Sequence, residues 1–427
     1  MSDRPHGALI LGGAHGGLAV ARSLGRHGIP VGFVTDNHRI TKFSRYVGFS
    51  ASWAGPTGAD AAGELIEIGR RHNLAGWLLC PGGDPEATLI ARDRTQLASF
   101  FRVVGPDWET ARWALDKRLT YERACALGIA HPWSYYPPDR QHVEQVDARF
   151  PLVIKPTTRW QTNAFTQAKA WRVDDKAALL SRYDQAVAAA GEHDIVLQEL
   201  IAGGGATQFS YAALWDRGKP VASLVARRTR QYPIEFGYSS TFVQTVENAE
   251  VETAAVRFLQ SLDYSGLVEV EFKFDTRTQR YNILDVNIRA WTWIALGSRA
   301  GVDFPYLLWQ VARGETVSPG KGQPGVAWMH FSRDLVAAWQ EMAMGRIAPA
   351  DYLVSFGVPT EFAAFALDDP LPGIVDLPLL AARMTNRRWS PTLQSLRQRM
   401  PWRRTRTPSD SAVRVQSQLN TSLPHGR

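Results

Sequence analysis

The chain has 427 residues, 45% hydrophobic and 21% charged, which is ordinary for a globular protein and long enough for two or three domains. Its net charge is +7, but eight arginines and no acidic residue lie between Arg383 and Arg406, which leaves about −1 for the rest. A near-neutral body argues against nucleic-acid binding, which needs a basic patch on the folded surface. Two cysteines, Cys80 and Cys125, exclude a disulfide framework.

The sequence has no recognisable targeting or membrane segment. No run of about 18 apolar residues marks a transmembrane helix. The N-terminus lacks a basic stretch followed by a long apolar core, so we expect no signal peptide. Together with the low cysteine count, this predicts a cytoplasmic protein.

The N-terminal part alternates between strands and helices. Apolar runs at 8–13 and 31–35 are typical of buried parallel strands, with a helix over 17–28 between them. The later elements of this part are a helix at 59–73, a strand at 76–84, a helix at 85–100 and a strand at 102–106. We predict a Rossmann-like α/β domain over 1–104.

The first strand–helix turn resembles a dinucleotide-binding fingerprint. Aligned with G-x-G-x-x-G, the sequence has Gly12, Ala14 and Gly17, and Asp36 follows 19 residues after the last glycine. The missing second glycine is the one that lets the backbone approach a pyrophosphate. We therefore interpret the glycines as a tight turn and a helix start, and keep an NAD(P)-dependent oxidoreductase as an alternative.

Downstream the pattern changes from α/β to α+β. The next predicted elements are a helical region at 107–128, a strand at 150–156, a helix at 173–191 and a strand at 194–201. From 206 to 290 the strands read as antiparallel, with a helix at 250–262 between them. A helical C-terminal region over 316–385 and a basic, disordered tail over 386–427 complete the predicted organisation.

The strongest chemical signal is a pair of strands at 268–274 and 281–289. Alternation places Glu269, Glu271 and Lys273 on one face of the first strand. On the second strand, Asp285 and Asn287 share a face with Arg289. If the two polar faces of this hairpin coincide, clustered carboxylate and amide oxygens suit Mg²⁺.

A solvated polar face of the sheet is the alternative interpretation of this hairpin. It accounts well for Glu269 and Lys273. It fits Asp285 and Asn287 poorly, because Asp and Asn are depleted in strands and the second strand is otherwise apolar.

The order of these segments resembles the ATP-grasp superfamily, and more narrowly its uncharacterised carboxylate–amine ligase-like members. The resemblance runs over about residues 8–310 and rests on an α/β domain followed by "DK", "VIKP", "LQELI", "VEVEF" and "ILDVNIR". It implies an ATP-grasp domain over 105–315, with lobes at about 120–200 and 201–315 and ATP between them.

The resemblance also implies roles for single residues. Lys117 and Lys155 would contact the nucleotide phosphates, and Glu199 and Ile201 would lie on the segment that reads adenine. The residues that would hold one or two Mg²⁺ ions, with Mn²⁺ as a substitute, are Glu271, Asp285 and Asn287. The arginine that stabilises an acyl phosphate would be Arg289.

The segment after the "VIKP" strand departs from the family. Many members have a glycine-rich loop there, whereas "KPTTRWQTNAFTQAKAW" has no glycine. Arg159 or Lys169 could cover the phosphates in its place. The second acid is Asp285 where many members have Glu, which shortens the reach of that ligand by one methylene.

Two arginine-rich segments complete the candidates. Arg228 and Arg230 share a strand face by alternation, which suits a clamp for a substrate carboxylate or a phosphate, although a charged edge strand would give the same pattern. The basic tail could contact an anionic membrane through Trp389 and Trp402, and we favour a solvated extension instead.

The predicted function is an ATP- and Mg²⁺-dependent ligase that joins a small-molecule carboxylate to an amine. No Ser–His–Asp or Cys–His arrangement stands out, and phosphoryl transfer needs no protein nucleophile. A catalytically degenerate ATP-binding scaffold is a further alternative, and homodimers are common among similar enzymes.

Overall fold

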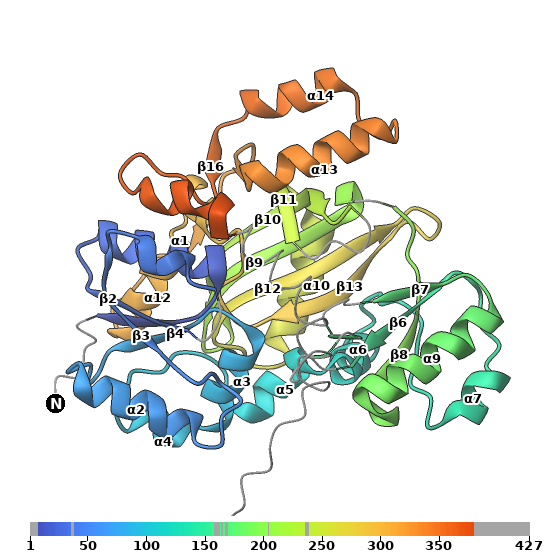
Figure 1. Ribbon diagram of the computed structural model, residues 1–427, viewed down its shortest axis with the longest axis horizontal. Coiled ribbons are helices and arrows are strands. Elements are labelled where there is room, and N and C mark those ends of the chain that lie inside the picture. The colour runs from blue at the N-terminus through green and yellow to red at the C-terminus, as the bar shows by residue number, and fades with distance from the viewer. Residues whose placement is uncertain are drawn as a thin grey trace, which may run out of the picture. The chain divides into compact units, whose positions relative to one another are not determined.

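The computed structural model describes residues 7–35, 38–157, 163, 165–166, 170–203, 205–234 and 239–379. Met1–Leu377 form one compact unit. Figure 1 shows three groups of strands along the chain, in blue, green and yellow-green. None of the described helices is long and apolar enough to cross a membrane.

The N-terminal group is a four-stranded parallel sheet. Its spatial order is β3 (Val47–Ser52), β2 (Val31–Thr35), β1 (Ala8–Leu11) and β4 (Leu78–Pro81). The central strands are apolar and buried, as their continuous hydrophobic runs predict. The accompanying helices are α1 (Ala14–Arg26), α2 (Ala61–Arg71), α3 (Asp84–Arg92) and α4 (Arg94–Ala98), with a 3₁₀ turn at Ile40–Phe43.

The sequence prediction of this sheet was wrong at its two edges. The edge strand β3 was missed because only alternate residues are even partly covered, and Gly, Ser and Ala dilute its pattern. The segment 102–106 does not form a regular strand and makes only an isolated bridge, from Arg102 to Leu78.

The second group is a smaller antiparallel sheet. Its order is β5 (Ser134–Tyr135), β8 (Ile195–Glu199), β6 (Leu152–Pro156) and β7 (Trp171–Val173). Two helices, α7 (Arg140–Gln145) and α9 (Lys176–Ala190), supply the apolar side chains that pack on it, among them Val143, Leu179 and Tyr183. A 3₁₀ turn at Glu192–Asp194 leads from α9 into β8.

The third group is an eight-stranded, mostly antiparallel sheet. Its main path runs β13 (Arg280–Asn287), β12 (Gly266–Asp275), β9 (Gln208–Asp216), β10 (Lys219–Tyr232), β11 (Ser239–Val246), β15 (Ala327–Met329) and β16 (Thr360–Phe362). A short strand, β14 (Gly320–Lys321), pairs with β10, and a 3₁₀ turn at Gly205–Thr207 precedes β9. The predicted antiparallel sheet is present, with three additional strands from the C-terminal region, β14, β15 and β16.

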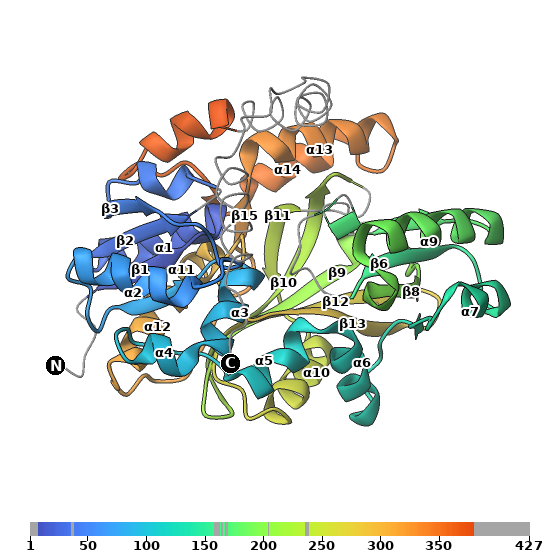
Figure 2. The same cartoon turned by 60° about the horizontal axis from the view of Figure 1, so that its bottom comes forward.

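Helices cover one face of the large sheet. Figure 2 shows α5 (Trp108–Leu115) and α10 (Ala249–Gln260) on the same side of β12 and β13. Their apolar side chains and those of α6 (Lys117–Ala126) form a core with the residues of β12 that face these helices, which are Val268, Val270 and Phe272. The alternation of β12 therefore directs Glu269, Glu271 and Lys273 to the opposite face.

The opposite face of the large sheet is apolar only in part. Ala212, Leu214 and Leu224 join a core with β1, β2, α1 and Trp291. This core anchors the first sheet against the large one. The remaining middle of the face carries the polar side chains described below.

The C-terminal region over 316–385 was predicted to be helical, but its described part, up to residue 379, also contains strands. Two helices, α11 (Ala295–Arg299) and α12 (Phe304–Ala312), precede this region. The region itself contains α13 (Phe331–Ala343), α14 (Pro349–Val354), a 3₁₀ turn at Ser355–Gly357 and helical residues at 371–379. It also supplies β15 and β16, which extend the large sheet beyond β11. Strands of three residues are too short to show a period in sequence.

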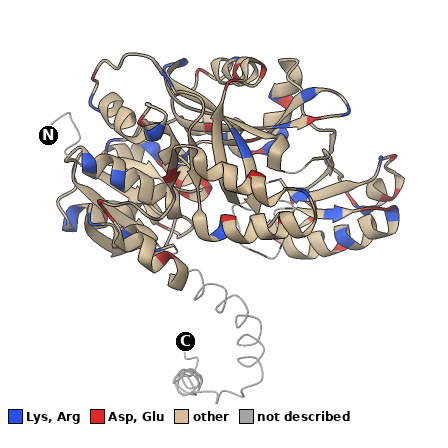
Figure 3. Cartoon of the chain, turned by 90° about the horizontal axis from the view of Figure 1, so that it is seen from above, with Lys and Arg blue, Asp and Glu red and all other residues tan. Residues whose placement is uncertain are grey.

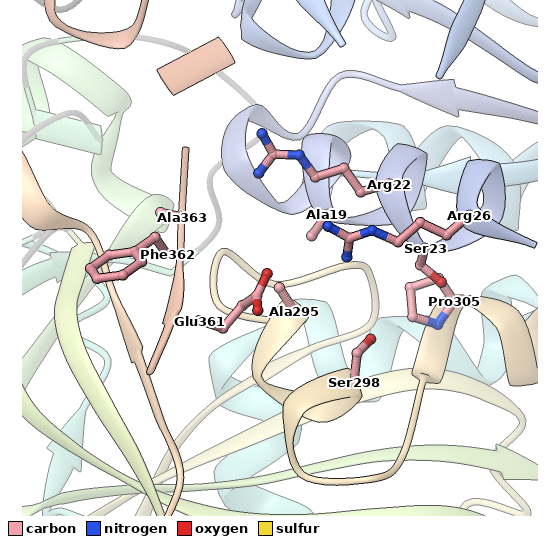
Figure 4. A pocket seen from close by; sticks show the side chains of 10 residues that line it. All are labelled: Ala19, Arg22, Ser23, Arg26, Ala295, Ser298, Pro305, Glu361, Phe362 and Ala363. Carbon is pink, nitrogen blue, oxygen red and sulfur yellow. The ribbon is translucent and has the colours of Figure 1, made fainter. Parts of the chain in front are cut away.

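An ionic seam joins α1 to the segment 361–369. Arg22 bonds to Asp369, and Arg26 bonds to Asp368 through two nitrogens. Figure 4 shows Arg22 and Arg26 on α1 and Glu361 on β16, which line a cavity of about 10 Å³, near the lower limit for one water molecule. We call the two ion pairs, Arg22–Asp369 and Arg26–Asp368, the seam.

Charges of both signs are interspersed along the described chain, as Figure 3 shows. This distribution agrees with the near-neutral body expected from the sequence. The basic tail of the prediction, 386–427, lies outside the described residues.

Candidate functional site

The β12–β13 hairpin brings the predicted oxygen ligands together. Glu271 lies directly opposite Asp285, and Glu269 lies opposite Asn287. The Asn287 amide nitrogen donates to Glu271 Oε1 at 3.0 Å and to Glu269 Oε2 at 3.1 Å. The register could not be fixed from sequence, and the structure makes the two polar faces coincide.

Three cations surround this hairpin. Arg228, from β10, forms an ion pair with Glu271, and its Nε donates to Ser240 Oγ at 2.6 Å. Lys117, the first residue of α6, donates to Asp285 Oδ1 at 2.8 Å. The acids of the hairpin therefore share cations that come from several elements. We call the following residues the hairpin cluster: Glu269, Glu271, Asp285 and Asn287, with the cations Lys117, Arg228 and Arg289.

Arg289 is the third cation, and it connects the hairpin cluster to the N-terminal sheet. Its guanidinium donates to Asn287 Oδ1 at 3.0 Å and to Asp84 Oδ1, at the start of α3, at 2.8 Å. Burial alone would lower the pKa of Arg289, but the carboxylates of Asp84 and Glu269 outweigh it and raise the pKa. Arg289 is therefore held as a cation between two regions of the chain.

Glu269 is a site residue that sequence reasoning missed. It is only 3% exposed, and it accepts hydrogen bonds from Ser210 Oγ at 2.9 Å and Trp293 Nε1 at 3.2 Å. Burial, followed by the charge of Glu271, raises the pKa of Glu269 to about 7, against the opposing effect of Arg228 and Arg289.

The alternative interpretation, a solvated polar face, is wrong for Glu269 and Lys273, the two residues that it explained well, because both are buried. Besides Glu269, Lys273 is buried and donates to the Gly203 carbonyl at 2.6 Å. Burial, and secondarily the charge of Arg228, lowers the pKa of Lys273 to about 8. The strand pattern gave the correct face, but it could not show that β9 and the residues after β13 cover that face.

Lys155 reaches the hairpin cluster through a chain of hydrogen bonds. Its Nζ donates to Gln198 Oε1 at 2.6 Å, and Gln198 Nε2 donates to the Tyr121 hydroxyl at 2.9 Å. Tyr121 in turn donates to the Leu284 carbonyl at 3.0 Å, next to Asp285. These contacts connect the smaller sheet to β13.

Glu199 and Ile201 lie at the end of β8, where the smaller sheet leads into the large one. Glu199 Oε1 accepts from the Trp133 backbone N–H at 2.9 Å, and Arg277 approaches Glu199 Oε2 at 3.4 Å. Ile201 is buried. The predicted residues Lys169 and Arg159, and Asp36 of the dinucleotide alternative, lie outside the described residues.

Comparison with known proteins supports an assignment at the level of the fold. Residues 223–319 match the family model of the ATP-binding domain of the carbamoyl-phosphate synthase L chain. The biotin carboxylase domain of Hydrogenobacter thermophilus 2-oxoglutarate carboxylase, solved with MgADP, ADP and bicarbonate, superposes with a TM-score of 0.60. It is 14% identical, over 76% of this chain and 74% of that one. The chain has an ATP-grasp fold.

Two ligases show the same likeness. Bacillus licheniformis L-amino acid ligase has a TM-score of 0.56 and 15% identity, over 76% of this chain and 79% of its own. Phosphoribosylglycinamide synthetase from Anaerococcus prevotii has a TM-score of 0.52 and 12% identity, over 73% and 75%. No curated protein is detectably similar to the chain in sequence.

Within this ATP-grasp fold, Arg230 is not part of the hairpin cluster. The register between β10 and β11 shifts on both sides of Arg230, so simple alternation does not hold there. Arg230 donates through two nitrogens to Asp334 of α13, at 2.9 and 2.8 Å, and its guanidinium lies 4.2 Å from the centre of the Phe242 ring. Arg228 and Arg230 thus have different acidic partners, and they do not form the paired clamp that the sequence suggested.

The N-terminal glycines permit close packing. Gly12 and Gly13 have positive φ, and a Cβ at Gly13 would lie 2.7 Å from Gly82 Cα. A Cβ at Gly16 would lie 2.8 Å from the Trp291 carbonyl. The turn therefore packs against the chain just beyond Arg289, which gives these glycines a steric role apart from any nucleotide.

Proposed function

We propose that the chain is an ATP- and Mg²⁺-dependent ligase that joins a carboxylate to an amine and releases ADP and phosphate. The observation that carries this proposal is the hairpin cluster. Acidic oxygens on two paired strands are surrounded by Lys117, Arg228 and Arg289, in an ATP-grasp fold. Oxygen ligands suit a hard cation, and flanking cations suit phosphate groups.

The chemistry of Glu271 and Asp285 fits a magnesium site. Their side chains are 21% and 20% exposed, so an ion can reach them from solvent. Both are carboxylates, the ligand type that Mg²⁺ prefers, and they lie opposite each other on adjacent strands. Mg²⁺ or Mn²⁺ held there would supply positive charge to the phosphates of ATP.

Asn287 occupies a different position in this arrangement. Its nitrogen faces Glu269 and Glu271, while its oxygen accepts from Arg289. In this orientation Asn287 positions the acids, and it would offer oxygen to an ion only with its amide turned over. We therefore assign ion binding first to the two carboxylates and second to Asn287.

The lysines and the connecting segment would hold ATP. Lys117 donates to Asp285, and Lys155 is connected through Gln198 and Tyr121 to the backbone of the neighbouring Leu284, so both lysines are linked to β13. We expect them to contact phosphates. Glu199 and Ile201, at the junction of the two sheets, would border the adenine.

The reaction needs positioning and charge more than a protein nucleophile. A carboxylate oxygen of the substrate would bond to the γ-phosphorus as the bond to ADP breaks, which gives an acyl phosphate. The amine would then attack the acyl carbon, phosphate would leave, and the nitrogen would lose a proton. Arg289 would neutralise negative charge on the acyl phosphate, because it is held as a partly buried cation beside the acids.

The test is ADP release from ATP and Mg²⁺ in the presence of pools of carboxylic acids, amino acids and amines. We expect release that depends on one carboxylate and one amine and that is lost in Glu271→Gln and Asp285→Asn. Glu122→Gln, which alters an exposed acid on α6, is the matched control and should retain activity.

Two outcomes would count against the ligase. ATP binding without turnover in any pool would favour a degenerate ATP-binding scaffold. NADH binding with no ATP binding would favour the oxidoreductase alternative. Sedimentation of the purified chain tests the predicted homodimer separately.

A further inference from the structure

A second cluster of side chains lies away from the hairpin. His15 is the second residue of α1, His330 directly precedes α13, and Asp376 belongs to the helical residues near 371–377. Their exposed fractions are 2%, 1% and 7%. Three segments far apart in the sequence thus bring two imidazoles and one carboxylate into the interior of the same unit.

The potential ligand atoms of this cluster converge. One atom from each of the three residues lies within 4.8 Å of the others. His15 Nε2 is 2.9 Å from Asp376 Oδ1, and His330 Nε2 is 3.8 Å from Asp376 Oδ2. Ligands on one tetrahedral zinc ion are roughly 3.3 Å apart, given bond lengths of about 2.0–2.1 Å, so only small movements are needed.

Internal hydrogen bonding pairs His15 with Asp376 but leaves one nitrogen of His330 unsatisfied. His330 Nε2 has no hydrogen-bond partner within the described part of the chain, although it is buried. Its other ring nitrogen, Nδ1, lies 3.3 Å from Ser332 Oγ, which orients the ring with Nε2 toward Asp376. A buried polar nitrogen without a partner is costly, and a metal ligand with its second nitrogen held in this way is a common arrangement.

A cavity adjoins the cluster on one side. It has a volume of about 340 Å³, and its lining includes His330, Ser332 and Asp376 together with apolar side chains from Phe331, Phe362 and Leu377. Two of the three candidate ligands therefore border a space large enough for a small molecule. A metal ion with three protein ligands could keep a further position open toward this space.

We propose that His15, His330 and Asp376 bind a divalent transition-metal ion of the Zn²⁺ class, with an open coordination position toward the adjoining cavity. Two imidazole nitrogens and one carboxylate oxygen suit Zn²⁺ and similar ions better than Mg²⁺, which prefers oxygen ligands. The ion would tie α1, the start of α13 and the helical residues near 376 to one another. Water or a small oxygen-donor ligand would occupy the open position.

The test uses the full chain without a histidine tag, freed of metal with a chelator. ZnCl₂ is titrated against a chromophoric competing chelator in excess Mg²⁺, so that the hairpin is occupied by the harder ion. We expect one Zn²⁺ per chain, and at least about 100-fold weaker binding in His330→Ala and Asp376→Ala. His142→Ala, which removes an exposed imidazole on α7, is the control and should bind as the wild type does. Two results would overturn the proposal: binding of less than one Zn²⁺ per wild-type chain, or wild-type affinity for Zn²⁺ in both His330→Ala and Asp376→Ala.

A second measurement does not depend on folded variants. Zinc-edge X-ray absorption of the wild-type chain should show two imidazole ligands, and a spectrum without imidazole scattering would contradict the site. Glu271→Gln changes no residue of this cluster, so its Zn²⁺ affinity should remain that of the wild type. A large loss in Glu271→Gln would place the ion at the hairpin and overturn the proposal, whatever the ligase assay shows.

Discussion

The molecule has two groups of buried charges that differ in how completely they are paired. In the seam, Arg22 and Asp369 have side chains that are 4% and 1% exposed. Asp369 accepts from Arg22 Nε, Ser44 Oγ and the Arg45 backbone N–H, at 2.7–2.9 Å. In the hairpin cluster, Glu271 and Asp285 remain about one-fifth exposed. The Arg22–Asp369 pair is therefore closed to solvent, whereas Glu271 and Asp285 are partly open to it.

The difference also shows in the balance of charge. Asp369 has a complete set of donors, and Arg22 further donates to the carbonyls of Ala364 and Asp369. In the hairpin, the charge of Glu271 adds to burial in raising the pKa of Glu269, so the acids there repel one another. A saturated pair holds structure together, whereas neighbouring acids open to solvent can gain from an added cation. Separate substitutions should therefore break stability in one region and ligand binding in the other.

The largest effect on folding is expected from Asp369→Ala. It leaves the Arg22 guanidinium buried without its carboxylate and should lower the free energy of unfolding by about 3–5 kcal/mol. Urea unfolding followed by circular dichroism measures this loss. The neighbouring pair Arg26–Asp368 is about 40% exposed, so Asp368→Ala should cost at most about 1 kcal/mol. Equal losses in the two variants would remove the distinction between closed and open pairs.

Glu271→Gln should produce the opposite result. We expect turnover of ATP to fall by about 10²–10³-fold, because a charge that would hold the metal ion is lost. Stability should fall much less than in Asp369→Ala, because removing one of the repelling acids relieves the group and Arg228 keeps Ser240 as a partner and the charge of Glu269. Paired measurements of ADP release and urea unfolding test both parts. We assign stability to the seam and ligand binding to the hairpin cluster. A Glu271→Gln variant that is strongly destabilised, but whose folded fraction keeps full activity, would contradict that assignment.

Much of the hairpin could be predicted from the sequence, because strand alternation places every second residue on one face. That rule grouped Glu271 with Glu269, and Asp285 with Asn287. The rule could not show what covers that face. Ser210 and Trp293, which bury Glu269, come from β9 and from the chain beyond β13.

The seam and the histidine cluster could not be predicted in the same way. Each joins a residue of α1 to residues more than 300 positions later, as in Arg22 with Asp369 and His15 with Asp376. No local period connects such residues, and a single sequence gives no covariation. Alternation also failed at Arg230, where the register shift between β10 and β11 directs the side chain to Asp334.

Lys117→Met tests the junction between the acids and the expected phosphate site. Losing a charged hydrogen bond of this type is worth about 1.5–3 kcal/mol, so we expect ATP binding to weaken by about 10–100-fold. Isothermal titration with the non-hydrolysed analogue of ATP and Mg²⁺ measures the change. Lys219→Met, at an exposed position in β10, is the control. Equal affinity in Lys117→Met and the wild type would remove Lys117 from the proposed phosphate contacts.

The smallest effect concerns the core that lies under α1, and it reports on the seam without an activity assay. Cys80 of β4 packs in that core with Ala19 and Val20, and burial raises the pKa of its thiol to about 12. At pH 8 the group is therefore protonated, buried and slow to react, whereas Cys125 is exposed. A thiol reagent such as DTNB should label one cysteine in the native chain and two in urea. The seam holds α1 to the segment 361–369. Asp369→Ala should therefore loosen α1 and speed the labelling of Cys80, while Glu271→Gln should leave the labelling rate of Cys80 unchanged. Equal rates in the two variants would mean that the seam does not control opening of this core.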